Sequence, residues 1–419
     1  MAATTTEAPV PRVNGNRLIA RLRELARIGG RPDGGVNRQA FSKEDAAART
    51  LVVDWARSAG LTAATDEIGN LFLRHEPPGS EGRPPILSGS HLDSQPMGGW
   101  LDGVYGVMAA LEAVESLKEQ AVALARPVEV VAWSNEEGSR FTPGVMGSAV
   151  YAGHVKLSEI ADNRDPAGTR LADALQDFLG ATPDLPVHDH ARPIAGLVEA
   201  HIEQGPILEN EGRTIGVVEA VQGIRWLEVT VRGEAAHAGT APLRGRRDAL
   251  LAATRMVQAM NEALHDPDDV IRFTVGRFIV EPGSPNTVAD KVLFTIDLRH
   301  PEADVLKTAV DTLRRVADET APPCSAAVKV VETLEPVRFD GAIVAAVAEA
   351  SEALGLPGRR IVSGAGHDAA QIAPHYPAGM IFVPCHKGIS HNPAENADEA
   401  DLIAGADVLA GTLARLAGR

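Results

Sequence analysis

Two helices are predicted at the start of the chain from the spacing of its hydrophobic residues. Leu18, Leu22 and Leu25 lie at helical spacing and are followed by two glycines, which readily end a helix. Ser42 is a residue type that caps helices, and acidic and then hydrophobic residues continue a helical pattern from it to Gly60. A helical layer is therefore expected before any strand.

Short hydrophobic runs come next, and each predicts a buried strand. Residues 103–118, between the first two runs, carry hydrophobic side chains on one helical face. Strands that alternate with helices are typical of a mostly parallel α/β sheet. The predicted strands are residues 86–90, 128–133 and 196–200, and they lead into His91, Asn135 and His201.

From about Gly216 the pattern changes to strands in which hydrophobic and polar residues alternate. The order strand, helix, strand, strand, helix, strand is that of the ferredoxin-like split unit. After Pro336 a helix (342–354) and a buried strand (380–384) resume the earlier pattern. The elements of the changed region are strand 226–232, helix 246–264, strands 271–280 and 291–299, helix 303–317 and strand 326–331.

These patterns predict a catalytic domain interrupted by a second domain. The catalytic domain is expected to be α/β with a mixed, mostly parallel sheet, and the insert to be an α+β lid or dimerisation domain. The first residues are small, polar and proline-containing and predict a disordered tail. The predicted boundaries are 1–14 for the tail, 15–215 and 333–419 for the catalytic domain, and 216–332 for the insert.

Composition narrows the classes of protein that remain. The chain has 40 Lys and Arg against 56 Asp and Glu, a net charge of −16, which disfavours binding to nucleic acid. The same negative charge repels anionic ligands at long range, so an acidic ligand must meet a locally placed arginine or a metal. Two cysteines, Cys324 and Cys385, predict a reduced, cytoplasmic protein. The sequence contains no run of 18 hydrophobic residues, so no membrane-spanning helix is predicted.

Histidine and acidic residues gather just after the predicted strands. His91, the pair Glu136–Glu137 and His201 each follow one strand, and the carboxyl ends of strands are where ligands bind in open α/β sheets. Asp102 follows His91 across a glycine-rich loop, and His391 follows the last predicted strand. Potential metal ligands from distant parts of the sequence are thus expected to converge at one edge of the sheet.

The number of these ligands favours two metals over one. A single tetrahedral zinc needs only three protein ligands and a water, whereas five ligands with one shared Asp suit a pair of ions. Asp93 is expected to accept the second imidazole N–H of His91 and fix its ring. Glu136 and Glu137 are adjacent and point in different directions, so one can bind metal while the other acts as a general base.

At these positions the chain resembles the N-carbamoyl-L-amino-acid hydrolases and allantoate amidohydrolases. These enzymes are the amidase branch of the dinuclear aminoacylase and carboxypeptidase-G superfamily. Peptidase relatives usually carry an acidic residue where His201 stands, so the similarity points to the carbamoylase branch. The resemblance runs from about residue 15 to the end, in matching order, through GSHLDS (89–94), LDG (101–103), NEEGSRF (135–141), HIEQGP (201–206) and GISH (388–391).

The resemblance implies two divalent metal ions per subunit and Glu136 as the general base. Histidine and carboxylate ligands suit zinc, manganese, cobalt and nickel alike, so the metal stays open. One departure is Trp100–Leu101 ahead of Asp102, where relatives usually carry Lys or Arg and then Phe. The implied ligands are His91 and His201 for one ion, Glu137 and His391 for the other, and Asp102 bridging both.

The resemblance also implies a function for the insert. His237 resembles an oxyanion-stabilising histidine supplied by the partner in a homodimer, and Asn286 and Arg299 resemble a substrate-binding pair. Arg299 would pair with a substrate carboxylate through its planar guanidinium. Gln204, in the motif of His201, is a further candidate substrate contact.

The expected reaction is hydrolysis of the carbamoyl C–N bond of an N-carbamoyl-L-amino acid to the amino acid, ammonia and CO2. Allantoate, a β-ureido acid or an N-acylated amino acid remain open as substrates. A metal-dependent binding protein of the same fold is the alternative outside enzymes, and the presence of Glu136 argues against it. For His367 and Asp368, the sequence does not separate a structural role from substrate contact.

Overall fold

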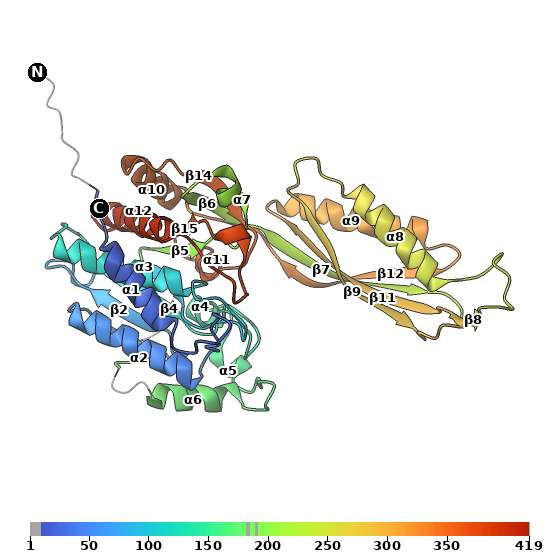
Figure 1. The fold of residues 1–419 in the computed structure, drawn as a ribbon, viewed down its shortest axis with the longest axis horizontal. Coiled ribbons are helices and arrows are strands. Elements are labelled where there is room, and N and C mark those ends of the chain that lie inside the picture. Colours follow the sequence, from blue (N-terminus) through green and yellow to red (C-terminus); the bar gives the residue numbers. More distant parts are fainter. Residues whose placement is uncertain (1–9, 182–184, 189–191, 419) are drawn as a thin grey trace, which may run out of the picture. The chain divides into compact units, whose positions relative to one another are not determined.

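The computed structural model describes residues 10–181, 185–188 and 192–418. The chain divides into two compact units (Figure 1). The first unit contains the residues up to Glu219 together with those from Arg338 onward, and the second unit is Ala220–Val337. The sequence-based boundaries of the insert, 216–332, lie a few residues earlier at each end.

A nine-stranded mixed sheet forms the centre of the first unit. Its order is β1-β2-β4-β3-β5-β15-β6-β13, and β14 pairs with β6. The four central strands, β4, β3, β5 and β15, run parallel to one another. On one side β2 pairs antiparallel with β4 and β1 antiparallel with β2, and on the other side β6 pairs antiparallel with β15. The strands are β1 (Thr62–Thr65), β2 (Leu71–His75), β3 (Ile86–His91), β4 (Val128–Trp133), β5 (Gly196–Ile202), β6 (Gly216–Val221), β13 (Val337–Arg338), β14 (Arg359–Ser363) and β15 (Ala378–Val383).

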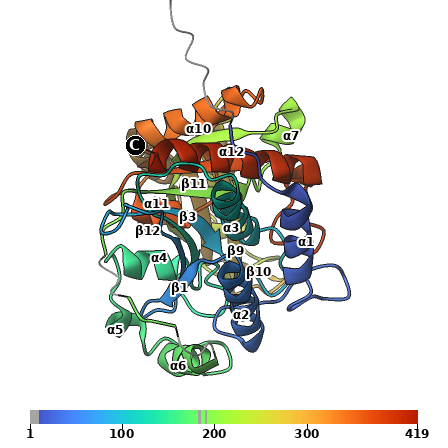
Figure 2. The same ribbon diagram turned by 90° about the vertical axis from the view of Figure 1, so that its left-hand side faces the viewer.

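Helices cover the central strands. Every residue of β3, β4, β5 and β15 is buried, as expected for parallel strands covered on both faces. Helix α3 packs on β3, β4 and β5, and α12 lies beside it on β5 and β15 (Figure 2). The helices are α1 (Gly15–Leu25), α2 (Lys43–Ser58), α3 (Val104–Glu119), α4 (Met146–Tyr151), α5 (Leu157–Ile160), α6 (Leu171–Ala181), α7 (Ile207–Glu211), α10 (Gly341–Ala353), α11 (Asp368–Ile372), the 3-10 turn η1 (His386–Gly388) and α12 (Glu399–Ala417).

The expected α/β class with a mostly parallel central sheet is confirmed, and so are the three strands that lead to His91, Asn135 and His201. Ser42 caps α2, since its hydroxyl accepts the backbone N–H of Asp45. The sequence analysis missed β1, β2, β6 and β14, which are short or lie toward the sides of the sheet, and it missed α12.

The predicted tail is only partly described. Residues 1–9 lie outside the described residues. The remainder is bound to the first unit, because Arg12 pairs with Asp407 and the backbone N–H of Val13 donates to the same carboxylate. Asn14 caps α1 by accepting the N–H of Arg17. For residues 10–14 the prediction of disorder is therefore wrong: partners almost four hundred residues away supply contacts that composition does not show.

The second unit has the ferredoxin-like order of elements. Its four-stranded antiparallel sheet runs β12-β7-β11-β9, and helices α8 and α9 pack on one face of it (Figure 1). Leu227, Phe294 and Leu313 lie in the core between sheet and helices. The elements are β7 (Gly223–Arg232), α8 (Ala249–Ala263), β9 (Arg272–Glu281), β11 (Lys291–His300), α9 (Ala303–Thr320) and β12 (Ser325–Leu334), with a two-stranded ribbon of β8 (Ala236–His237) and β10 (Thr287–Val288).

Among the described residues, no helix is both long enough and apolar enough to span a membrane.

Candidate metal centre

The parallel strands of the first unit deliver the candidate residues to one edge of the sheet. His91 is the last residue of β3, and His201 is the next-to-last residue of β5. Glu136 and Glu137 follow β4, which lies beside β3. His391 follows β15, which lies beside β5. Because neighbouring parallel strands end at the same edge, residues up to 300 positions apart are brought together.

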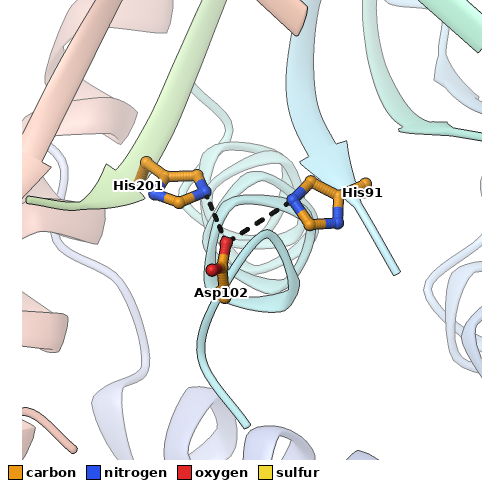
Figure 3. A group of neighbouring side chains, drawn as sticks. All are labelled: His91, Asp102 and His201. Carbon is orange, nitrogen blue, oxygen red and sulfur yellow. Dashed lines mark ion pairs between the residues drawn. The ribbon is translucent and has the colours of Figure 1, made fainter. Parts of the chain in front are cut away.

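Asp102 lies in the middle of this group, just ahead of α3. Figure 3 shows His91 at the end of β3 and His201 at the end of β5, both directed at the Asp102 carboxylate. Its Oδ1 is 3.1 Å from Nε2 of His201 and 3.6 Å from Nε2 of His91. Its Oδ2 is 3.2 Å from Nε2 of His391. The two oxygens of one carboxylate therefore face two different sets of residues.

The two buried histidines turn their Nε2 atoms toward Asp102. Nδ1 of His91 donates to the carbonyl oxygen of Asp93 at 2.9 Å, and Nδ1 of His201 donates to that of Ile202 at 2.8 Å. A neutral ring with its proton on Nδ1 has a bare Nε2, which can bind a cation beside Oδ1. Burial acts to lower the pKa of both rings, but the neighbouring carboxylates outweigh it and raise their pKa, so a proton on Nε2 can take the place of a cation.

Glu137 joins His391 and Asp102 on the other side. Its Oε2 lies 3.4 Å from Nε2 of His391. Gln95 holds the same carboxylate through its backbone N–H at 3.0 Å and its side-chain amide at 2.7 Å. The Glu137 carboxylate is therefore oriented before any ligand arrives.

The donor set fits divalent metal ions. Metal–ligand bonds of 2.0–2.2 Å in a tetrahedral site place neighbouring ligand atoms roughly 3.3 Å apart. The distances from Asp102 to the three histidines, 3.1 to 3.6 Å, lie around that value. Among the described residues, three groups have ligand atoms close enough for one ion, and two of them, His91–Asp102–His201 and Asp102–Glu137–His391, share Asp102.

Glu136 is placed differently from Glu137. Its Oε2 is 3.5 Å from Nε2 of His91, and it belongs to none of the ligand groups found among the described residues. The backbone N–H groups of Glu136 and Glu137 donate to the two carboxylate oxygens of Asp93 at 3.3 and 3.2 Å. Asp93 thus fixes the end of β4.

One predicted contact is made through the main chain. Asp93 was expected to accept the second imidazole N–H of His91, and it does so through its carbonyl oxygen at 2.9 Å. Its carboxylate oxygens accept from the backbone after β4 instead, and the nearer one is 3.8 Å from His91. Asp93 still supports the ring, through its main chain.

Burial and charge shift the pKa values of the acids and bases here. Burial raises the pKa of Glu136 well above its ordinary value, while the charge of His91 opposes this shift. Burial also acts to raise the pKa of Asp102, but hydrogen bonds to the histidines, beginning with His201, hold it well below its ordinary value. The hydrogen bond to Asp102 raises the pKa of His391 to about 9.

Strained backbone surrounds the group. Asn135, Gln204 and His391 have positive φ angles of 51°, 56° and 53°, a region that residues other than glycine seldom adopt. Such strain clusters at functional sites, where packing holds it in place. Gln204 donates from Nε2 to Asp102 Oδ2 at 2.9 Å, and its buried Oε1 has no hydrogen-bond partner among the described residues.

The candidate residues of the second unit lie together only in part. His237 and Asn286 are neighbours, because His237 pairs with Thr287 across the β8/β10 ribbon. Nδ1 of His237 accepts the N–H groups of Gly239 and Thr240, so a neutral ring carries its proton on the exposed Nε2. Arg299 lies on β11, where its Nε and Nη2 donate to the Asp297 carboxylate, both at 2.9 Å.

Some residues around the centre escaped the sequence analysis. Gln95 stands directly after the motif of His91, so its position was a usable signal. His367, whose role was left open, packs edge-on against His201 with ring centroids 4.7 Å apart and lies in a third group of potential ligands with Glu199. Glu395 contacts the Asp102 loop, and no motif marked it.

Relatives of known name are similar to the chain over nearly its whole length. The chain is 39% identical to the N-carbamoyl-L-amino-acid amidohydrolase of Rhizobium meliloti over 407 residues, covering 95% of each chain. It is 38% identical to the allantoate amidohydrolase of Escherichia coli (strain K12) over 398 residues, 94% of this chain and 96% of that protein.

Solved structures and a family model agree with these relatives. The crystal structure of an amidase of the hydantoinase/carbamoylase family from Burkholderia multivorans matches with a TM-score of 0.90 at 43% identity, covering 98% of this chain and 100% of that one. The model of Peptidase family M20/M25/M40 matches residues 87–415. The chain therefore belongs to the M20/M25/M40 peptidase family, and its resemblance to the carbamoylase and allantoate amidohydrolase branch is confirmed.

Proposed function

We propose that this protein is an amidohydrolase that uses two divalent metal ions to cleave the carbamoyl C–N bond of an N-carbamoyl-L-amino acid. The observation that carries the proposal is the Asp102 carboxylate, whose two oxygens face separate ligand groups. The family is metal-dependent. Four relatives that are 36–39% identical to this chain bear the name of this activity.

The residues that would hold the ions are those of the two groups. When bound, divalent ions act as Lewis acids, which stabilise negative charge developing on a carbonyl oxygen and make water more acidic. Zinc, manganese, cobalt and nickel all suit histidine and carboxylate ligands. The ligands would be His91 and His201 for one ion, Glu137 and His391 for the other, and Asp102 for both.

Glu136 is the proposed general base. It lies beside His91 but outside both ligand groups, so its carboxylate remains available for a proton. Burial, which raises its pKa, favours the protonated form that must later act as an acid. Glu136 would take a proton from the attacking water and return it to the leaving nitrogen.

Substrate recognition is assigned to both units. The unpartnered Oε1 of Gln204 is a buried acceptor that an N–H of a ureido or amide group would satisfy. His237 carries an exposed Nε2–H, which suits it to donate to an oxyanion. Arg299 would read the substrate carboxylate, with Asn286 beside His237 as a second polar contact.

We further propose that the protein is a homodimer in which the insert acts as lid and interface. The open edge strand β9 of the second unit has Phe278 and Ile279 exposed, and pairing with a twofold copy would cover such an edge. His237 would then act in the active site of the other subunit.

Allantoate is a second candidate substrate. Relatives named allantoate amidohydrolase are 38% and 34% identical to this chain, which hardly separates them from the carbamoylases. β-Ureido acids and N-acylated amino acids share the same acid and amide groups.

A substrate panel tests the proposal. Ammonia release would be measured from N-carbamoyl-L-amino acids, their D-enantiomers, allantoate and β-ureidopropionate, and amino-acid release from N-acetyl-amino acids, with each divalent metal in turn. The highest kcat/KM is expected for an N-carbamoyl-L-amino acid. A higher value for allantoate would reassign the substrate, and no turnover of any compound with any metal would reject the proposed function.

A further inference from the structure

A buried carboxylate that belongs to neither ligand group connects the loops of Asp102 and His391. Glu395 is only 2% exposed. Its Oε1 accepts the backbone N–H groups of Leu101 at 2.9 Å and of Asp102 at 3.0 Å. Its Oε2 lies 2.9 Å from the hydroxyl of Ser390, and that hydroxyl lies 2.7 Å from Oδ2 of Asp102. Glu395 therefore contacts both the main chain and, through Ser390, the carboxylate of Asp102.

The loop ahead of Asp102 fits tightly around this carboxylate. A Cβ added at Gly99 would lie 2.1 Å from the Glu395 carboxyl carbon, a distance that no real contact allows. Glycine is thus needed at position 99 because the buried carboxylate occupies the space of a side chain. The backbone of this loop has little freedom to shift while Glu395 is present.

On the other side, Glu395 is fixed to the loop that carries His391. Its own N–H donates to the carbonyl oxygen of Asn392 at 3.0 Å, and the N–H of His386 donates to the carbonyl oxygen of Asn396 at 2.8 Å. These bonds close the loop after β15 around His391. A single side chain thus joins two segments that are almost 300 residues apart in sequence.

We propose that Glu395 is a positioning residue that holds Asp102 and His391 at the separation a cation requires in the group Asp102–Glu137–His391. The inference rests on the proposed function only in that this group binds a divalent ion. Glu395 touches no reacting atom and acts through the two loops. Residues that orient metal ligands in this way typically change metal affinity about 10- to 100-fold when they are removed.

Two substitutions of Glu395 distinguish the effect of its hydrogen bonds to the two loops from the effect of its negative charge. In Glu395→Gln the carbonyl oxygen can still accept both backbone N–H groups, and the amide can donate to the Ser390 hydroxyl, so the connection survives without the charge. Glu395→Ala removes the connection and the charge together. Asp66→Asn and Asp66→Ala are matched controls, because Asp66 is also fully buried and accepts the N–H of Asn70, yet lies in neither ligand group.

The experiment is a calorimetric titration of each metal-free variant with Mn²⁺ or Co²⁺, accompanied by its melting temperature. Wild type is expected to bind two ions, Glu395→Ala to bind one of them about 10- to 100-fold more weakly, and Glu395→Gln to stay close to wild type. The Asp66 variants are expected to melt at lower temperature with unchanged metal affinity.

Three results would overturn the proposal. The first is an unchanged titration of Glu395→Ala. The second is a Glu395→Gln variant as weak as Glu395→Ala, which would show that charge acts and position does not. The third is an equal loss of affinity in Asp66→Ala, which would mean general destabilisation. If Glu395→Ala does not fold, Ser390→Ala removes the connection at Oε2 and must weaken the same ion; unchanged affinity there also overturns the proposal.

The titration needs no substrate, so the two proposals can fail separately. A wild type that binds two ions in the expected way but hydrolyses no ureido acid would reject the proposed function and leave the role of Glu395 intact. A wild type that hydrolyses N-carbamoyl-L-amino acids while Glu395→Ala binds metal normally would do the reverse.

Discussion

The two units differ in how they hold their candidate residues. In the first unit, His91 and His201 contact Asp102 directly and all three are at most 5% exposed, although His391 is exposed. In the second unit, His237 and Asn286 are both exposed and are held by the β8/β10 ribbon and its turns. A buried group of mutually bonded ligands is preformed and tolerates little change, whereas exposed residues on a separate unit can vary with the substrate. Metal chemistry and substrate recognition are thus expected to respond differently to mutation.

Metal removal should have the largest effect. Chelation is expected to abolish turnover completely, because five residues of the first unit gather around positions that suit ions. Adding a divalent metal should restore activity, as measured by ammonia release together with metal analysis. Full activity in chelator-treated protein that contains one ion or none would contradict the two-ion site.

Within the first unit, substitutions of the two adjacent glutamates should cause different defects. Glu136→Gln is expected to keep both metals and to lose about 10²- to 10⁴-fold in kcat, since it removes proton transfer. Glu137→Gln should instead lower metal occupancy, because this carboxylate lies beside His391 and Asp102. Steady-state kinetics and metal content of both variants test this assignment. Loss of metal in Glu136→Gln and loss of turnover alone in Glu137→Gln would reverse the roles of base and ligand.

In the second unit, His237→Ala should leave metal content unchanged and lower kcat by about 10²- to 10³-fold, the effect of losing one oxyanion donor. Both properties can be measured on the same preparation. Loss of bound metal in this variant would contradict the assignment of His237 to substrate turnover alone.

A mixing experiment asks whether His237 acts across the proposed dimer. When inactive Glu136→Gln and His237→Ala dimers are dissociated and mixed, about half of the new dimers are mixed, and each mixed dimer has one site with both residues intact. For independent sites, activity should recover to roughly a quarter of wild type. No recovery in a sample shown to contain mixed dimers would place His237 in the site of its own chain or in none.

Arg299→Lys should have the smallest effect. It keeps the charge but loses the planar fork that Arg299 now presents to Asp297. The expected fall in kcat/KM corresponds to a loss of about 1–3 kcal/mol in transition-state stabilisation. Wild type should handle a substrate amide, which lacks the carboxylate, about as poorly. Equal kcat/KM for acid and amide would exclude this role.

The sequence was informative wherever one strand determines the position of a residue. The runs before His91, Glu136 and His201 are short, continuous and hydrophobic, and parallel strands necessarily bring their ends to one edge. The ferredoxin-like order of the insert was readable for a related reason, since its strands alternate along their length. The fold class and the family are confirmed, and the roles of the site residues remain predictions.

The features that the sequence did not show depend on long-range contacts. Glu395 follows His391 by four residues with no pattern of its own, and its importance comes from a loop near residue 100. The choice of carbonyl over carboxylate at Asp93 depends on which donors β4 brings close. Strands such as β1 (TAAT) and β14 (RRIVS) mix polar and hydrophobic residues and contain no continuous hydrophobic run.

The order of the strands has a consequence for how the protein is made. Strand β15, which lies between β5 and β6 in the central sheet, is encoded after the whole of the insert. During synthesis from the amino terminus, the continuous second unit is complete while the first unit still lacks β15, so the edges of β5 and β6 stay without this neighbour. The nascent chain therefore passes through a stage in which its later domain can fold before its earlier one, while the edge of the sheet that carries the candidate ligands still lacks His391.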